Sequence, residues 1–176
     1  LDFIEIKDQL VSSAEYLLAL KVMKIFNEKR GLFSILEKYI QESSPSEIDL
    51  YIHDDPIFTQ YEVAKTIYEL RGKQAFDFMF DARMDNLYIF KLLCELWRNG
   101  QLRDDAHLIV HVLDRAGPVN ETIRNEVADL LCDIILDFDA RNGQNSDTHA
   151  KEDARIIREN LENCFLEQRF TDINDL

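Results

Sequence analysis

Glycine and proline are scarce in this chain, with 5 glycines and 3 prolines in 176 residues. These two residues interrupt regular structure most strongly, so the chain has few of the usual markers of turns. A fold that depends on many tight turns is therefore disfavoured. Long helices joined by short connections are the structure that this composition favours.

Cysteine is also rare, and the three cysteines, Cys94, Cys132 and Cys164, are widely spaced. No CxxC pair exists, which excludes a zinc knuckle and a dithiol redox motif. Cys94 lies in the apolar run LLCELW, so we expect it to be a small, inert core residue. Unpaired thiols and the lack of a visible signal peptide predict a cytoplasmic location. Because the chain opens on Leu1 and not on methionine, we expect it to be trimmed at its N-terminus.

Cations are few relative to carboxylates, with 20 basic and 34 acidic residues, a net charge of −14 and a pI near 4.6. The electrostatic field of this negative charge repels a nucleic-acid backbone and an anionic membrane surface. We therefore predict no direct nucleic-acid partner and no membrane partner for this segment. Basic proteins, basic peptides and metal cations are the partners that the charge favours.

Apolar residues nevertheless make up 46% of the chain, which is enough to build a core. The periodicity predicts an all-α protein, and we expect one domain over residues 1–176 with a hinge at 142–148. Its architecture would be a bundle of about eight helices or a solenoid-like stack of antiparallel pairs. The expected helices are 2–29, 32–42, 46–53, 56–70, 73–82, 85–99, 102–116, 119–141 and 148–170.

The first of these helices, 2–29, has its apolar residues on one face, and Gly31 is expected to end it. Its second half, YLLALKVMKIF from Tyr16 to Phe26, is apolar nearly all round but too short to span a membrane. This segment predicts either a central helix or the seam of a homo-oligomer. The run AFDFMFDA (75–82) alternates like a strand, but no second strand is predicted to pair with it, so we expect a helix.

Each proline can be placed at the start of a helix, where its missing N–H costs nothing. Ser44 and Glu47 around Pro45 form the pattern of a capping box. Asp55 would cap a helix that begins at Pro56, and Pro118 would precede the helix at 119–141.

Two histidines lie four residues apart in the helix at 102–116. His107, His111, Asp104 and Asp114 fall within about 80° of one another on a helical wheel. His107 and His111 could share a metal with Asp114 as an oxygen ligand, although a further ligand from another helix would be required. The alternative is that these residues form the solvated side of the helix, with Asp104 capping its start. We expect no metal and no other cofactor.

The sequence YIHDDP contains a His-Asp doublet, His53 and Asp54, that resembles the core of the all-helical HD phosphohydrolases. That family also needs an upstream histidine, and no histidine precedes His53 here. The alternative interpretation is that Asp54 and Asp55 compete to cap the next helix.

The helix at 119–141 carries an acidic stripe at positions i, i+3, i+7 and i+11, made of Glu126, Asp129, Asp133 and Asp137. Glu126 and Asp129 form an ExxD that resembles half of the Mg²⁺-binding pattern of MazG-type nucleotide pyrophosphohydrolases. The matching ExxE is missing from the preceding helix. The stripe could instead dock a basic partner by charge complementarity, or be the solvated face of a very acidic protein.

The aromatic residues of 76–97 are numerous enough to line a groove, although such clusters are more often core: Phe76, Phe78, Phe80, Tyr88, Phe90 and Trp97. No glycine-rich phosphate loop and no GxSxG motif is present. The sequence therefore favours a non-enzymatic interaction module, an adaptor, regulator or inhibitor that holds a basic protein or peptide on its acidic stripe. The alternative is a metal-dependent hydrolase that uses carboxylates of the 119–141 helix.

Overall fold

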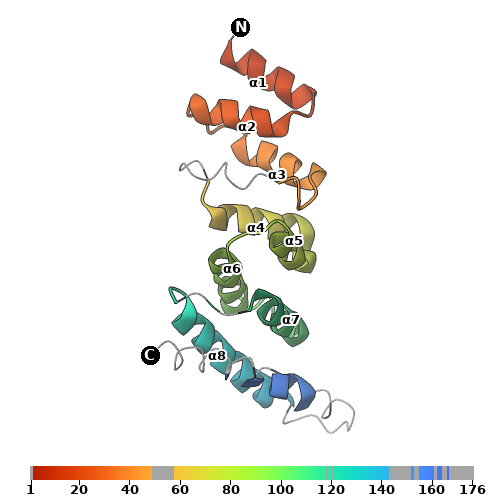
Figure 1. Ribbon diagram of the computed structural model, residues 1–176, viewed down its shortest axis with the longest axis vertical. Coiled ribbons are helices and arrows are strands. Elements are labelled where there is room, and N and C mark those ends of the chain that lie inside the picture. Colours follow the sequence, from red (N-terminus) through yellow and green to blue (C-terminus); the bar gives the residue numbers. More distant parts are fainter. Residues whose placement is uncertain are drawn as a thin grey trace. The chain divides into compact units, whose positions relative to one another are not determined.

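The structure is a computed structural model that describes residues 2–48, 58–117, 119, 121–142, 152, 155–160, 162, 163 and 166. Every regular element within these ranges is helical, so the predicted all-α class is confirmed. Figure 1 labels the α-helices in chain order, and the short 3₁₀ helix η2 (Gly72–Gln74) joins two of them. Eight α-helices are described: α1 (Phe3–Ser12), α2 (Tyr16–Ile25), α3 (Leu32–Glu42), α4 (Gln60–Arg71), α5 (Ala75–Asp81), α6 (Asn86–Arg98), α7 (Ala106–Ala116) and α8 (Arg124–Asn142).

The chain divides into two compact units, Leu1–Met84 and Asp85–Leu176. The prediction of one domain over residues 1–176 stays a prediction. Its hinge at 142–148 falls almost entirely on residues outside the described ranges. Each unit is therefore described separately below.

The prediction of a single helix over 2–29 is wrong, because the chain turns back at residues 13–15 to form the α1–α2 hairpin. Ala14 adopts a left-handed φ of 58°. The Glu15 N–H donates to the Leu10 carbonyl (2.8 Å), and the Ala14 N–H donates to the Val11 carbonyl (3.1 Å). This is the Schellman pattern that ends many helices. The Ser13 hydroxyl also donates to a carbonyl of the last turn, which helps to end α1.

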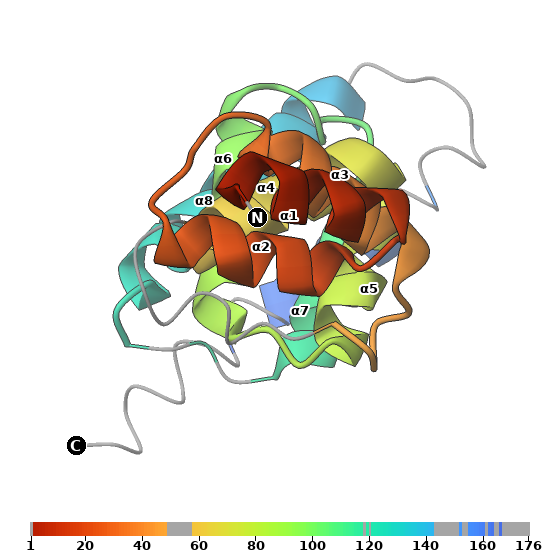
Figure 2. The same ribbon diagram turned by 90° about the horizontal axis from the view of Figure 1, so that it is seen from above.

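The hairpin brings the two ends of the expected long helix together. The rings of Phe3 and Phe26 have centroids 4.8 Å apart, and Figure 2 shows α1 and α2 side by side. The buried side of α2 consists of Ala19, Leu20 and Met23. It is therefore not the face that periodicity over 2–29 predicted.

The N-terminal unit continues with helices that each pack on the next one in sequence, from α1 to α5. Such nearest-neighbour packing is the pattern of a solenoid-like stack. Arg71 links three of these helices: its Nη2 donates to the Ile40 carbonyl (3.0 Å), and its guanidinium lies 4.1 Å from the Phe78 ring centroid.

Two helix starts in this unit differ from the prediction. α4 begins at Gln60, not at Pro56, because Thr59 and Glu62 form a complete capping box. Glu47 accepts a hydrogen bond from the Ser44 N–H, as expected, but residues 45–47 form a turn and no helix. The short helix expected near 46–53 falls mainly on residues outside the described ranges.

The AFDFMFDA segment forms α5, and the helical prediction is confirmed. It buries Ala75, Phe76, Phe78 and Met79, while Asp77 is exposed. The alternation of phenylalanines therefore does not indicate a strand. The described ranges contain no strand that could pair with it.

In the C-terminal unit, α6 is the most deeply buried helix, and Asp85 caps its start by accepting from the Leu87 N–H (3.0 Å). The Asn86 amide donates to the Ala116 carbonyl (3.0 Å), which joins the start of α6 to the end of α7. α7 begins at Ala106 and not at 102, and α8 begins at Arg124 and not at 119. α6 packs against α8, so the acidic helix has one face on the core.

Candidate interaction surface

The outer side of α8 carries two exposed carboxylates and one exposed leucine. Val127, Leu130, Leu131 and Ile134 on its inner side are buried. Asp129 and Asp133 are exposed on the opposite side, and Leu136 beside them is 67% exposed. At about 100° per residue these three side chains lie within about 60° of one another. The surface of Asp129, Asp133 and Leu136 is called the α8 outer face below.

The four carboxylates of the predicted stripe have different surroundings. Asp137 pairs with Arg103 (3.2 Å) and with Arg141 (3.1 Å), and its side chain is only 24% exposed. Glu126 pairs with Arg98 at 3.4 Å, with both side chains largely exposed. Two of the four carboxylates of the stripe are therefore already paired with arginines of the same chain.

Asp129 and Asp133 make no ion pair with any residue in the described part of the chain. They are also the two members of the stripe that point most directly away from the buried side of α8. The structure thus separates the stripe into an outward pair and two positions held within the molecule.

The position of Asp137 is structural. The Arg103 guanidinium lies 4.5 Å from the Trp97 ring centroid and bonds Asp137. Arg141 bonds both Asp137 and Asp104. This arginine–carboxylate network fastens the turn after α6 to the end of α8. It also corrects the predicted role of Asp104, which lies in the turn before α7 and does not cap it.

The proposed metal residues do not assemble into a site. His107, His111 and Asp114 are all exposed on α7. Across the described ranges, no three His, Cys, Asp or Glu side chains lie where they could hold one metal ion. His53 and Asp54 of the His-Asp doublet lie outside the described residues.

A segment after α8 covers another side of that helix. Residues 155–160 are helical, as predicted for 148–170, and Ile157 is buried. Arg158 pairs with Asp139 of α8 at 3.1 Å and with Glu162 at 2.8 Å. The hydrogen bond that Arg158 donates to Glu162 and the negative charge of Asp139 raise the pKa of Arg158. The described part of this segment leaves the α8 outer face exposed.

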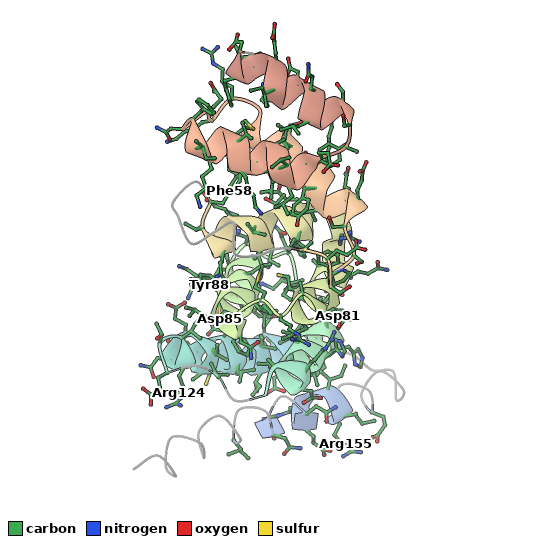
Figure 3. The ribbon with its side chains drawn as sticks, turned by 45° about the horizontal axis from the view of Figure 1, so that its top comes forward. Phe58, Asp81, Asp85, Tyr88, Arg124 and Arg155 are labelled. Atoms are coloured by element: carbon green, nitrogen blue, oxygen red, sulfur yellow. The ribbon has the colours of Figure 1, made fainter. Side chains whose placement is uncertain are left out.

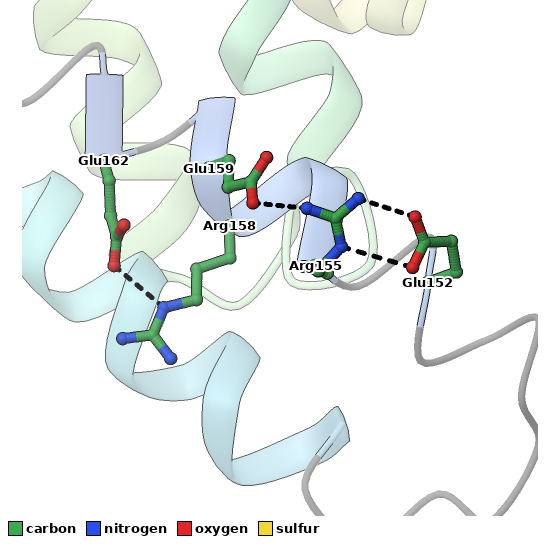
Figure 4. Close-up of polar contacts among 5 residues, drawn as sticks. All are labelled: Glu152, Arg155, Arg158, Glu159 and Glu162. Carbon is green, nitrogen blue, oxygen red and sulfur yellow. Dashed lines mark hydrogen bonds and ion pairs between the residues drawn. The ribbon is translucent and has the colours of Figure 1, made fainter.

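Arg155 on the same segment lies between two glutamates, Glu152 and Glu159, as Figure 4 shows. Its hydrogen bond and its charge lower the pKa of Glu152. All three side chains are exposed and belong to one segment, which Figure 3 shows beside α8 with Arg155 labelled. These pairs support the local helix and offer no free charge for a partner.

Cys94 is buried, as expected, and burial raises the pKa of its thiol to about 11. Nearby Arg98 opposes this rise only in part. The thiol therefore stays protonated and unreactive at neutral pH. Cys132 is free and exposed on α8, and Cys164 lies outside the described residues.

Most of the aromatic cluster of 76–97 belongs to the core, although Phe80 is only partly buried. Phe76, Phe78, Phe90 and Trp97 are all buried in their respective units. Tyr88 is partly exposed.

Sequence reasoning missed Leu136, which it assigned neither to the core nor to the stripe. The signal was available, because position 136 is i+7 from Asp129 and i+3 from Asp133 and so shares their side of the helix.

Comparisons of the chain with protein-family models, with curated proteins and with solved structures found no match. No family match therefore supports the resemblance of the ExxD motif to MazG-type enzymes. The same holds for the resemblance of the His-Asp doublet to HD phosphohydrolases. Among the described residues, no helix combines the length and the apolar character that crossing a membrane requires.

Proposed function

We propose that this chain is a non-enzymatic helical interaction module that docks a basic protein or peptide on the α8 outer face. The observation that carries the proposal is an exposed leucine, Leu136, beside two carboxylates, Asp129 and Asp133, that pair with no described cation. A partner helix with lysine or arginine next to an apolar residue would complement both features. An adaptor, a regulator or an inhibitor would use such a surface.

The two remaining stripe residues contribute differently. The Glu126–Arg98 pair is exposed on both sides, and such pairs contribute little, so Glu126 can exchange its partner for a cation of the ligand. Asp137 is held by two arginines and stays in its structural role. We therefore assign the docking role to Asp129 and Asp133 first, with Glu126 at the margin.

The test uses an amphipathic helical peptide of lysine and leucine, 19 residues long to match α8. Its affinity should fall when salt rises from about 0.1 M to about 1 M, because the screening length shrinks from roughly 10 Å to roughly 3 Å. Asp129→Lys with Asp133→Lys should abolish binding. The matched control is Glu42→Lys with Glu69→Lys, which changes the net charge equally on exposed positions of other helices and should bind almost normally.

If both double variants lose the same amount of peptide affinity, net charge alone attracts the peptide, and the assignment of the binding site to α8 is wrong. Circular dichroism of each variant separates lost binding from lost folding. All four substituted side chains are exposed, so we expect unchanged helicity.

The alternative prediction, a metal-dependent hydrolase, has a direct test of its own. Mg²⁺, Mn²⁺ and Zn²⁺ are titrated while the melting temperature is followed. A tight site on the folded chain would raise that temperature by several degrees. We expect no such rise.

We also propose a cytoplasmic location. The exposed thiol of Cys132 is free, and free thiols are the usual state of cysteine in a reducing compartment.

A further inference from the structure

The N-terminal unit exposes an apolar face on α2. Leu18 and Ile25 are 48% and 77% exposed, and they lie on the side of the helix opposite the buried Ala19 and Met23. Phe26, at the end of α2, is 58% exposed. Exposed apolar residues that gather on one side of a helix mark an interaction site more often than isolated ones do.

The same stretch is basic within a very acidic protein. Residues 21–30 (KVMKIFNEKR) contain four cations and the single carboxylate Glu28, a net charge of +3 in a chain of −14. Lys29 and Arg30 are exposed, and Lys21 is exposed on the helix side that carries Leu18 and Ile25. We call Leu18, Lys21 and Ile25 the α2 face.

The α8 outer face has the opposite composition. Residues 125–140 contain five carboxylates and no lysine or arginine. Glu126, Asp137 and Asp139 pair with arginines of the same unit, which leaves Asp129 and Asp133 as the negative charge of the outer face. Leu136 is the large apolar residue that this helix exposes. Each of the two faces thus combines exposed apolar surface with charge, and the two signs are opposite.

We propose that the partner of the α8 outer face is a second copy of this chain, which docks through its α2 face. This proposal rests on the proposed function and names the partner. Two different surfaces meet, so the interface is heterologous and repeats from copy to copy into a ring or an open chain.

The spacing of the side chains supports this pairing. Leu18 and Ile25 are seven residues apart, as are Asp129 and Leu136, so each pair spans about 10.5 Å along its helix. In an antiparallel arrangement with Leu136 against Leu18, Lys21 comes opposite Asp133, and Ile25 comes opposite Asp129 at the edge of the contact. In this register the apolar contact of Leu18 with Leu136 and the ion pair of Lys21 with Asp133 form together.

Sedimentation of the full chain over a range of concentrations tests the proposal with two double variants. Leu18→Gln with Ile25→Gln removes the apolar contacts of the α2 face and adds no charge, and Asp129→Arg with Asp133→Arg reverses the charge of the α8 outer face. Wild type should self-associate, less so at high salt, and each variant should weaken self-association at least about tenfold. A mixture of the two variants should form a dimer and nothing larger, because it retains one intact α2 face and one intact α8 outer face.

The mixture is the decisive measurement, since the altered α2 face keeps Lys21 and is repelled by the arginines of the altered α8 outer face. A monomeric wild type, a variant that associates like wild type, or a mixture that stays monomeric overturns the proposal. All four substituted residues are exposed, and circular dichroism checks their folding. If the arginine variant loses helicity, Asp129→Asn with Asp133→Asn replaces it.

Failure of this inference is distinguishable from failure of the proposed function. The variant with a blocked α2 face keeps its α8 outer face and can be titrated with the lysine–leucine peptide. A monomeric wild type together with peptide binding by this variant would remove only the self-association. If the wild type is monomeric and this variant also fails to bind the peptide, the docking role of α8 is wrong as well.

Discussion

Replacing Asp137 with asparagine should destabilise the C-terminal unit. The change keeps the size of the side chain and removes its charge. It breaks the ion pairs with Arg103 and Arg141, which lie 3.2 Å and 3.1 Å from the carboxylate oxygens. Arg103 also rests on the Trp97 ring, so its position depends on both partners.

The expected loss follows from the exposure of the groups. An exposed ion pair contributes about 0.2–1 kcal/mol, and the partners here are between 24% and 44% exposed. Two coupled pairs at the upper end of that range predict a loss of about 1–2 kcal/mol. With a typical slope for urea unfolding, the midpoint should fall by roughly 0.5–1 M.

Trp97 supplies the assay, because it is the only tryptophan of the chain and lies buried beside the network. Its fluorescence during urea unfolding reports on the C-terminal unit. The matched control is Asp133→Asn, four residues earlier on α8, where the carboxylate is exposed and pairs with no described residue. That change should shift the free energy of unfolding by less than about 0.5 kcal/mol. Equal losses for the two variants would refute the structural role of Asp137.

Four further predictions concern other parts of the fold. Ala14→Gly should stabilise the N-terminal unit by up to about 1 kcal/mol in thermal unfolding, because glycine adopts the φ of 58° without strain; a continuous helix over 2–29 would instead be destabilised. Thr59→Ala should cost about 1 kcal/mol by removing the capping box of α4, measured in the same way. A thiol reagent at pH 8 should modify Cys132 quickly and Cys94 only on unfolding. The pKa of Cys94 in the folded protein is about 11, against 9.0 for an ordinary thiol, so the stability that the neutral thiol contributes is complete below pH 9 and is lost as the pH rises towards 11. The Cys94→Ala variant should therefore lose less stability than the wild type between pH 9 and pH 11.

Local sequence signals were sufficient to predict two of the short helices, α3 and α6, almost to the residue. The apolar period and Gly31 predicted α3 at its observed bounds, and Asp85 with Asn99-Gly100 predicted α6 to within one residue. The burial of Cys94 followed from its apolar neighbours. The helical state of α5 followed from the lack of a partner strand. In each case the deciding interactions lie within a few residues along the chain.

Other features depended on contacts between distant residues. Nothing in the pattern of 2–29 marks Ala14 as a turn, and the hairpin is recognised by the contact of Phe3 with Phe26. The pairing of Asp137 with Arg103 joins residues that are 34 apart in sequence.

The sequence by itself thus determined the helical class, the strong negative charge and the spacing of the carboxylates on α8. Only the tertiary structure decided which of those carboxylates meet an arginine and which face outward with Leu136. The physical reason is range: helix periodicity and capping act over three or four residues, whereas an ion pair forms between side chains that packing brings together.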